Sequence, residues 1–327
     1  MITVSQPRLY TPEERKYYVV IERENPLPDW DYMREVTIDN TQNSNTLSDF
    51  QVQITLDTAS LISDGKMKSD CGDVRVYDSN TESLLPYWVE TGTENSSSTR
   101  IWVKVPSIPG GGKKTIYLFY GNPGATSQSN GDDVFEFFDD FEGTSLDTTK
   151  WSFVDGSSVT VSNSEITLSG STTGVSTLNY KTFPINTIAE FRAKMSGEYA
   201  TYFGHDDYDG STVNNYILVH LTSGFAVRKG DSSTTLTRNA GVGVYHIWSI
   251  KRIGSDTVKF YADGTYDNGI TSTTYVPTVD LPLILRSQLS DTLVCDWVRV
   301  RKFADPEPTT SVGAEQDPEK RIVERSW

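Results

Sequence analysis

The sequence predicts an all-β protein of two β-sandwiches in tandem, with an extended arm at each end. Three observations lead to this prediction. Apolar and polar residues alternate over many short runs, which is typical of strands that bury one face. Turns rich in Gly, Asn, Ser and Asp separate these runs, so the strands are short and numerous. The 327 residues suffice for two domains of ordinary size.

The first 29 residues are expected to form an extended arm. Pro7, Pro12, Pro26 and Pro28 fall within it, and proline at this density argues against a helix. One strand is expected in the apolar run at 17–22.

Residues 30–125 are expected to form the first sandwich, and residues 126–133 the linker that follows it. Alternation is clearest in three runs, which hold Phe50, Val52 and Ile54, then Ile101, Val103 and Val105, then Ile116, Leu118 and Tyr120. The segment Gly121–Asp133 is rich in Gly, Asn, Ser and Asp and marks the boundary.

Residues 134–303 are expected to form the second sandwich, and residues 304–327 a polar C-terminal tail. Strands are predicted at 159–168, 188–195, 216–221, 224–229, 245–252, 257–262 and 292–301. The tail starts with the proline-bearing run Asp305-Pro-Glu-Pro308, and its last stretch contains the apolar residues Ile322, Val323 and Trp327.

Two segments bracket the second sandwich. They read Phe138-Asp-Asp-Phe141-Glu-Gly-Thr-Ser-Leu146-Asp-Thr-Thr-Lys-Trp151-Ser-Phe153 and Val294-Cys-Asp296-Trp-Val-Arg-Val-Arg-Lys-Phe303. The pair resembles the first and last strands of the concanavalin A-like jelly roll of legume lectins, laminin G-like modules and laminarinase-type glycoside hydrolases. The resemblance implies a jelly roll with one concave sheet that binds glycans or proteins, and catalysis in some members only.

A second resemblance covers residues 30–125. The resemblance lies in five segments: Phe50-Gln-Val-Gln-Ile54, the run from Gly65 to Tyr77, Leu85-Pro-Tyr-Trp88-Val-Glu90, Ile101-Trp-Val-Lys-Val-Pro106 and Ile116-Tyr-Leu-Phe-Tyr120-Gly-Asn. They resemble an uncharacterised prokaryotic β-sandwich family, a domain of unknown function that commonly precedes a concanavalin A-like domain. The resemblance implies an architecture and no particular chemistry.

The chain carries 44 acidic and 29 basic residues, so its net charge is −15. Such a surface repels polyanions, and we expect no nucleic-acid partner. No apolar run is long enough to span a membrane, so we expect no membrane insertion. The N-terminus lacks the basic and apolar regions of a signal peptide, although sandwiches of this kind are usually extracellular.

The hydrolases of this fold carry a Glu-x-Asp-x-(x)-Glu pattern on one strand, where residues i and i+2 share a face. The corresponding segment here is Asn214–Leu221, which holds no acidic residue. The sequence therefore predicts that the protein is not an enzyme.

The segment from Tyr199 to Gly210 combines aromatic and acidic side chains. Sugars stack their C–H surfaces on aromatic rings, and planar polar groups hold their hydroxyls. The ligand-binding residues are expected to be Tyr202, His205, Asp207, Tyr208 and Asp209. The alternative is an ordinary strand followed by a solvated turn.

A structural Ca²⁺ is expected on the convex side of the jelly roll, and no other cofactor. Relatives hold this ion with an Asp of the last strand and carbonyl groups near the first, and the matching positions are Asp296 and Glu142-Gly143. The alternative, in which Asp296 pairs with Arg299 or Arg301, stays open.

The leading hypothesis is a non-catalytic adhesion protein that binds a glycan or a surface protein at the exterior of a cell or virion. The alternative is a structural subunit of a virus particle (capsid, decoration or spike protein) or of a surface array. Such a subunit would join virion proteins, or its own copies in a homo-oligomer, through its terminal arms. A glycoside hydrolase is the second alternative, and it predicts β-glucan turnover that depends on Asp207 or Asp209.

Overall fold

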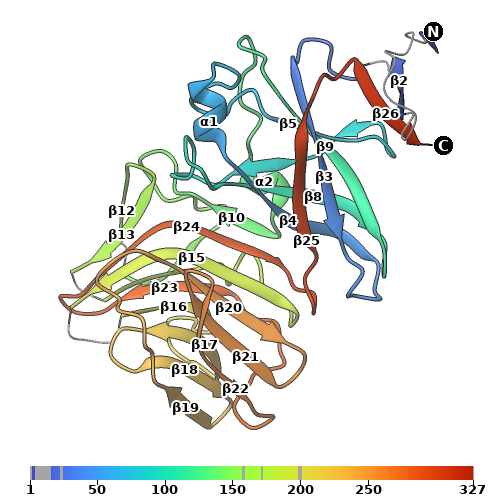
Figure 1. Ribbon diagram of the computed structural model, residues 1–327. Coiled ribbons are helices and arrows are strands. Elements are labelled where there is room, and N and C mark those ends of the chain that lie inside the picture. The colour runs from blue at the N-terminus through green and yellow to red at the C-terminus, as the bar shows by residue number, and fades with distance from the viewer. Residues whose placement is uncertain are drawn as a thin grey trace. The chain divides into compact units, whose positions relative to one another are not determined.

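The computed structural model describes residues 2–3, 16–22, 25–156, 159–170, 172–197 and 201–326 (Figure 1). Strands make up almost all of the regular structure in these residues, beside two short helices, α1 (Thr58–Ser63) and α2 (Gly131–Val134). The predicted all-β fold class is therefore confirmed. The chain divides into two compact units, one of residues 1–134 with 305–327 and one of residues 135–304.

The first unit contains two larger antiparallel sheets, with the orders β25-β3-β9-β5-β6 and β4-β8-β7. Their strands are β3 (Tyr32–Asp39), β4 (Leu47–Leu56), β5 (Arg75–Asp78), β6 (Ser83–Leu84), β7 (Tyr87–Val89), β8 (Thr99–Ile108), β9 (Lys113–Tyr120) and β25 (Thr309–Gln316). Alternate residues such as Val36 and Ile38 of β3 are fully buried, as expected for strands with one face in a core.

The C-terminal segment is not the polar tail that the sequence predicted for residues 304–327. After the second unit the chain returns to the first, where β25 pairs with β3 as the outermost strand of the five-stranded sheet. The second unit is thus inserted within the first rather than following it in simple tandem. Sequence analysis missed β25 because Val312 is its one large apolar side chain, which suits an edge strand.

A third sheet pairs the two ends of the chain. It has the order β1-β2-β26, with β1 (Ile2–Thr3), β2 (Lys16–Glu22) and β26 (Lys320–Ser326). Strand β2 lies where a strand was predicted at 17–22. The two segments expected to be separate extended arms are therefore joined along β2 and β26. Pro7, Pro12 and Trp327 lie outside the described residues.

Glu315 anchors β25 to the first unit. Its carboxylate forms an ion pair with Lys66 (Oε1 to Nζ, 2.6 Å) and accepts a hydrogen bond from the Tyr120 hydroxyl (2.9 Å). The same hydroxyl accepts a hydrogen bond from Nε of Arg34 (2.9 Å). Burial alone would raise the pKa of Glu315, but the hydrogen bonds from Lys66 and Tyr120 outweigh it and lower the pKa.

The second unit consists of two antiparallel sheets in the jelly-roll arrangement. The eight-stranded sheet has the order β12-β13-β24-β15-β20-β21-β22, with β10 also paired to β24, and the seven-stranded sheet has the order β11-β14-β23-β16-β17-β18-β19. The strands of the eight-stranded sheet are β10 (Phe137–Asp139), β12 (Val159–Ser162), β13 (Glu165–Ser169), β15 (Thr187–Ser196), β20 (His246–Ile253), β21 (Thr257–Ala262), β22 (Thr265–Thr271) and β24 (Thr292–Lys302). Those of the seven-stranded sheet are β11 (Ser152–Asp155), β14 (Thr173–Ser176), β16 (Tyr202–Asp206), β17 (Asn215–His220), β18 (Gly224–Lys229), β19 (Ser232–Leu236) and β23 (Leu283–Ser287).

One hydrophobic core joins the two sheets of the second unit. The fully buried side chains that line it include Phe203, Ile217, Phe225 and Leu285 from the seven-stranded sheet and Phe191, Ile250, Phe260 and Val298 from the eight-stranded sheet. Aromatic rings meet between the sheets, with the ring centres of Phe191 and Phe203 5.0 Å apart. One face of the seven-stranded sheet packs against this core, and the other face is turned away from it.

We expect the E315Q variant to destabilise the first unit, because it removes the charge that pairs with Lys66 and weakens the bond from Tyr120. The loss should be about 1–2 kcal/mol of unfolding free energy at pH 7, measured by chemical denaturation. Because the folded pKa of Glu315 is lowered, its stabilisation is present above the usual glutamate pKa and is lost as the pH falls through the lowered value. The matched control is E319Q, an exposed glutamate of the same segment. An equal loss in both variants would contradict the anchoring role.

Candidate functional site

The seven-stranded sheet has a second face, turned away from the core, which we call the outer face. In β16, Phe203 and His205 point to the core, so Tyr202, Gly204 and Asp206 belong to the outer face. The cross-strand register continues this alternation into the neighbouring strands. Outer-face residues of adjacent strands therefore lie opposite one another in rows.

Three rows cross the outer face at right angles to the strands. The first row is Asp155, Gly174, Arg286, Tyr202 and His220; the middle row is Ser176, Ile284, Gly204, Leu218 and Ala226; the third row is Asp206, Tyr216 and Arg228. The middle row is mostly apolar, and its side chains are buried with Val154, Tyr208 and Tyr216 packed against them, whereas the rows beside it carry aromatic and charged groups. The five strands from β14 to β18 span about 19 Å at the usual strand spacing.

Arg286 organises the first row. Its Nε donates to Oδ2 of Asp155 (2.5 Å), and its Nη1 donates to the Tyr202 hydroxyl (2.8 Å). Gly174 lies between Arg286 and Asp155 in the register. A Cβ atom at position 174 would lie 3.2 Å from Cγ of Arg286, so the glycine makes room for the arginine to cross β14.

Two tyrosine rings flank this arginine. The guanidinium carbon lies 4.6 Å from the ring centre of Tyr208 and 5.6 Å from that of Tyr202. The Tyr208 hydroxyl donates to Oδ1 of Asp155 (3.1 Å), which ties the loop after β16 to the first row. Tyr202 is buried and Tyr208 half-buried, so Tyr208 keeps ring surface in contact with solvent.

His220 extends the first row beyond Tyr202. The two rings are stacked, with centres 5.7 Å apart and planes 15° from parallel. Burial, together with the charge of Arg238, lowers the pKa of His220, so the imidazole is neutral at pH 7. The backbone N–H of Ser223 donates to Nδ1 (3.2 Å), so the ring proton is on Nε2, where it is a hydrogen-bond donor.

Asp206 is a carboxyl group of the third row and is 1% exposed. The backbone N–H of Tyr208 donates to its Oδ1 (3.0 Å). Burial, reinforced by the charge of Asp207, raises the pKa of Asp206 to about 7 against the opposing charge of Arg286. Near neutral pH the group therefore exists in both forms and can donate as well as accept a hydrogen bond.

The structure separates the five predicted ligand residues. Tyr202 and Tyr208 both belong to the outer face. His205 does not, because it lies on the core face of β16 with its ring centre 6.3 Å from that of Phe183, and it is fully buried. Burial also lowers the pKa of His205 well below its usual value. The prediction of His205 as a ligand residue is therefore corrected: side chains of adjacent strand residues point to opposite faces.

Asp207 and Asp209 hold the loop after β16 in shape. Asp207 accepts hydrogen bonds from the backbone N–H groups of Asn214 (2.8 Å) and Asn215 (3.0 Å). Asp209 accepts them from the backbone of Ser211 and Thr212 (both 2.9 Å), and these bonds lower the pKa of Asp209. The arrangement corresponds to the turn that sequence analysis kept as the alternative.

Several outer-face residues escaped the sequence analysis, namely Asp155, Asp206, Tyr216, His220, Arg228 and Arg286. Tyr216 and His220 share one face of the strand predicted at 216–221, and that parity is a signal that could have found them. Arg286 and Asp155 are 131 positions apart in the chain, and no local pattern connects them.

The residues proposed for calcium do not assemble a donor set. Asp296 forms an ion pair with Arg192, and Glu142 accepts a hydrogen bond from the Ser164 hydroxyl (2.9 Å). Within the described part of the chain, no group of three or more His, Cys, Asp or Glu side chains could hold a metal ion. These side chains do not fit a Ca²⁺ site as they stand, and Ca²⁺ at Asp296, Glu142 and Gly143 stays a prediction.

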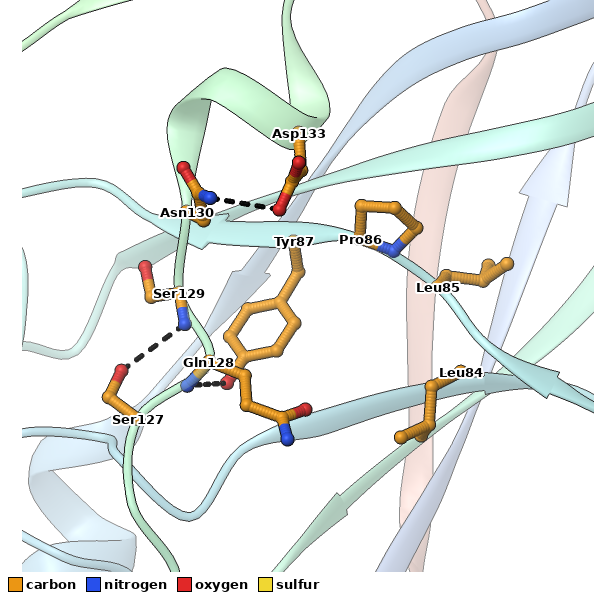
Figure 2. A pocket seen from close by; sticks show the side chains of 9 residues that line it. All are labelled: Leu84, Leu85, Pro86, Tyr87, Ser127, Gln128, Ser129, Asn130 and Asp133. Carbon is orange, nitrogen blue, oxygen red and sulfur yellow. Dashed lines mark hydrogen bonds between the residues drawn. The ribbon is translucent and has the colours of Figure 1, made fainter.

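The first unit has an open groove of its own, with a volume of about 580 Å³ (Figure 2). It is lined by Leu84, Leu85, Pro86, Tyr87, Ser127, Gln128, Ser129, Asn130 and Asp133. Asn130 donates to Asp133 (2.8 Å), and the backbone of Gln128 donates to the Tyr87 hydroxyl (3.3 Å). Tyr87, the aromatic residue of this lining, is 3% exposed and offers little ring surface to a ligand. The outer face, where Tyr208 and Tyr216 are half-buried and keep ring surface in contact with solvent, is the stronger candidate site.

Comparison with known proteins matches part of the chain to a family model. Residues 70–154 match a domain of unknown function, DUF2341. The match overlaps the resemblance stated for residues 30–125 and continues into β11 of the second unit. A relative in Methanocaldococcus jannaschii is the uncharacterized protein MJ1472, which is 25% identical over 260 residues. That alignment covers 73% of this chain and 47% of the relative, so the chain spans about half of the relative's length.

Solved structures similar to this chain include β-glucanases. An endo-β-1,3-glucanase from Pyrococcus furiosus is 15% identical, with a TM-score of 0.41, over 52% of this chain and 95% of its own. A β-1,3-1,4-glucanase (lichenase) derived from a mouse hindgut metagenome is 13% identical, with a TM-score of 0.41, over 51% of this chain and 99% of its own. Matches to enzymes contradict the prediction that the protein is not an enzyme, and we drop it. Identities and TM-scores this low assign no reaction to this chain.

The helices of the described residues are all too short or too polar to cross a membrane. The expectations about nucleic-acid, glycan and protein partners stay predictions.

We expect D206N to stabilise the second unit at high pH and not at low pH. The carboxyl has a pKa of about 7 in the folded protein against a usual 3.8, so unfolding releases a proton between these values. The unfolding free energy of the wild type should therefore fall as the pH rises from 4 to 7. At pH 8 the D206N variant should be more stable than the wild type by up to about 4 kcal/mol. Chemical denaturation at pH 4, 6 and 8 measures this.

The matched control is D155N, which removes the ion-pair partner of Arg286 on the same face. This variant should lose about 2 kcal/mol at pH 8, the opposite sign to D206N. A D206N effect that is the same at pH 4 and pH 8 would contradict the raised pKa.

Proposed function

We propose that the outer face of the seven-stranded sheet binds a carbohydrate. The observation that carries the proposal is the row pattern, in which a mostly apolar middle row lies between two rows of aromatic and charged side chains. Because the side chains of the middle row are at most 5% exposed, the apolar surface that such a site needs comes from the half-buried rings of Tyr208 and Tyr216 that pack against the row. Carbohydrates require both apolar and polar contacts, because a pyranose ring has apolar C–H faces and a polar hydroxyl edge.

Each component of a sugar site has a candidate on this face. Tyr208 and Tyr216 are half-buried and offer ring surface to the C–H faces of a sugar. The Nε2–H of His220 and the guanidinium of Arg228, both half-buried, can bond hydroxyl groups from the two flanking rows. A span of about 19 Å across five strands suits an oligosaccharide laid across the strands better than a single sugar.

The setting we propose is adhesion or glycan recognition at an exterior surface of a cell. The alternative of a structural virion subunit that assembles through free arms has weaker support, because β2 and β26 pair within the same chain. Half-buried tyrosine rings beside single polar groups favour a glycan over a surface protein as the partner.

Hydrolysis of the bound glycan is a second candidate function, favoured by one observation. Asp206 belongs to the outer face, and its pKa of about 7 leaves it a proton to donate near neutral pH; because the side chain is 1% exposed, this role requires the loop after β16, whose Tyr208 N–H donates to it, to move. The carboxylates named for this role by the sequence, Asp207 and Asp209, are engaged by the backbone of their own loop. If a β-glucan is turned over, reducing-end assays should show activity that D206N removes and D209N retains; loss in D209N with activity in D206N would refute this assignment.

We expect Y216A to weaken oligosaccharide binding about tenfold, because it removes an aromatic surface worth about 1.4 kcal/mol. Isothermal titration calorimetry with β-1,3- and β-1,3-1,4-gluco-oligosaccharides, followed by a broad glycan array, measures the change. The matched control is Y266A, a tyrosine 55% exposed on β22 of the other sheet, which should bind as wild type. Undiminished binding by Y216A would exclude the third row from the site, and no binding of any glycan by the wild type would refute the proposed function.

A further inference from the structure

The five-stranded sheet of the first unit carries an apolar cluster on the face opposite its core residues. Met33 of β3 and Phe119 of β9 are register partners, and Tyr117 of β9 is the register partner of Tyr77 of β5. Met33, Tyr117 and Phe119 form one buried cluster against which Tyr77 packs. Aromatic residues on two neighbouring strands are thereby brought together on one side of the sheet.

A pocket of about 190 Å³ opens beside this cluster. It is lined by Pro26, Met33, Tyr77, Ser79, Glu82, Tyr117, Phe119 and Pro318. The rings of Tyr77 and Phe119 stand at 89° to each other with centres 6.3 Å apart. Both rings line the pocket, Tyr77 half-buried and Phe119 buried, and the volume is that of a small organic group rather than of a polymer.

Glu82 determines the charge of this pocket. Among the described residues of its lining Glu82 is the charged one, and no described residue pairs with or donates a hydrogen bond to its carboxylate. Arg75, the register partner of Phe119, is held by the Trp30 ring (5.2 Å) and by backbone carbonyl groups, and it does not line the pocket. The same face therefore already accommodates one cation on an aromatic ring.

We propose that this pocket binds a quaternary ammonium group, such as the trimethylammonium head of choline. Such a group has an apolar methyl shell that fits rings, methionine and proline, and a positive charge that ring faces and a carboxylate attract. It carries no N–H and needs no hydrogen-bond acceptor, so Glu82 attracts it by charge alone. The net charge of −15 disfavours anions throughout the chain. This inference is independent of the carbohydrate proposal, which concerns the other unit.

The test compares choline with its neutral carbon isostere, 3,3-dimethylbutan-1-ol, on the full chain by ligand-observed NMR titration. Both ligands have the same shape, so a preference for choline reports charge recognition alone. Choline should bind at least about fivefold more tightly than the isostere, and E82Q should weaken choline about fivefold while leaving the isostere unchanged. The control D64N removes an exposed carboxylate of the same unit outside the pocket and should change neither affinity.

A third arm with Nε-trimethyl-lysine distinguishes a small-molecule head group from a methylated side chain as the source of the cation. Tighter binding of either one supports the proposal and names the source. Equal affinities of choline and the isostere, or no binding of either by the wild type, would overturn it. An E82Q variant that binds choline as the wild type does would overturn the role of the carboxylate and with it the proposal.

Discussion

The packing of two sheets on one core governs the chemistry of the second unit. Because Phe203 must face Phe191 across that core, the period of two places Tyr202 and Asp206 on the opposite face. The same rule sends His205 inward, where it is fully buried. Each strand of the seven-stranded sheet thus places every second residue on the outer face, and the register between strands aligns these residues into rows. The outer face is a consequence of the core rather than a separate design.

Within that surface, a glycine and an arginine connect distant parts of the chain. Arg286 crosses β14 above Gly174 to reach Asp155, and it also holds the Tyr202 hydroxyl. A planar guanidinium with fixed partners on two sides positions the rings beside it with little freedom. The loop after β16 joins this arrangement through Tyr208, so the aromatic surface offered to a ligand is preorganised, which lowers the entropic cost of binding.

The two carboxyl groups of this face lie in contrasting surroundings. Asp155 accepts from a guanidinium and a phenol, whereas Asp206 is buried with a backbone N–H as its donor and a second aspartate next to it. Burial without a paired cation keeps a proton on Asp206 up to neutral pH, at a cost in stability. Groups kept in a costly protonation state are frequently functional, which is why Asp206 carries the second candidate function.

The sequence alone determined the fold class, because strand alternation and turn composition are local properties, and it also singled out Tyr202 and Tyr208. It placed most strands of both units, and it found β2. It could not place β25, whose pairing with β3 joins residues about as far apart in the chain as Thr310 and Ile38. Nor could it predict that Arg286 contacts Asp155, or that His205 points to the core while its neighbours in the strand lie on the outer face. The register of a strand depends on which strands pair with it, and the face on which a side chain lies depends on which side of the sheet the core is. Only the tertiary structure decides both.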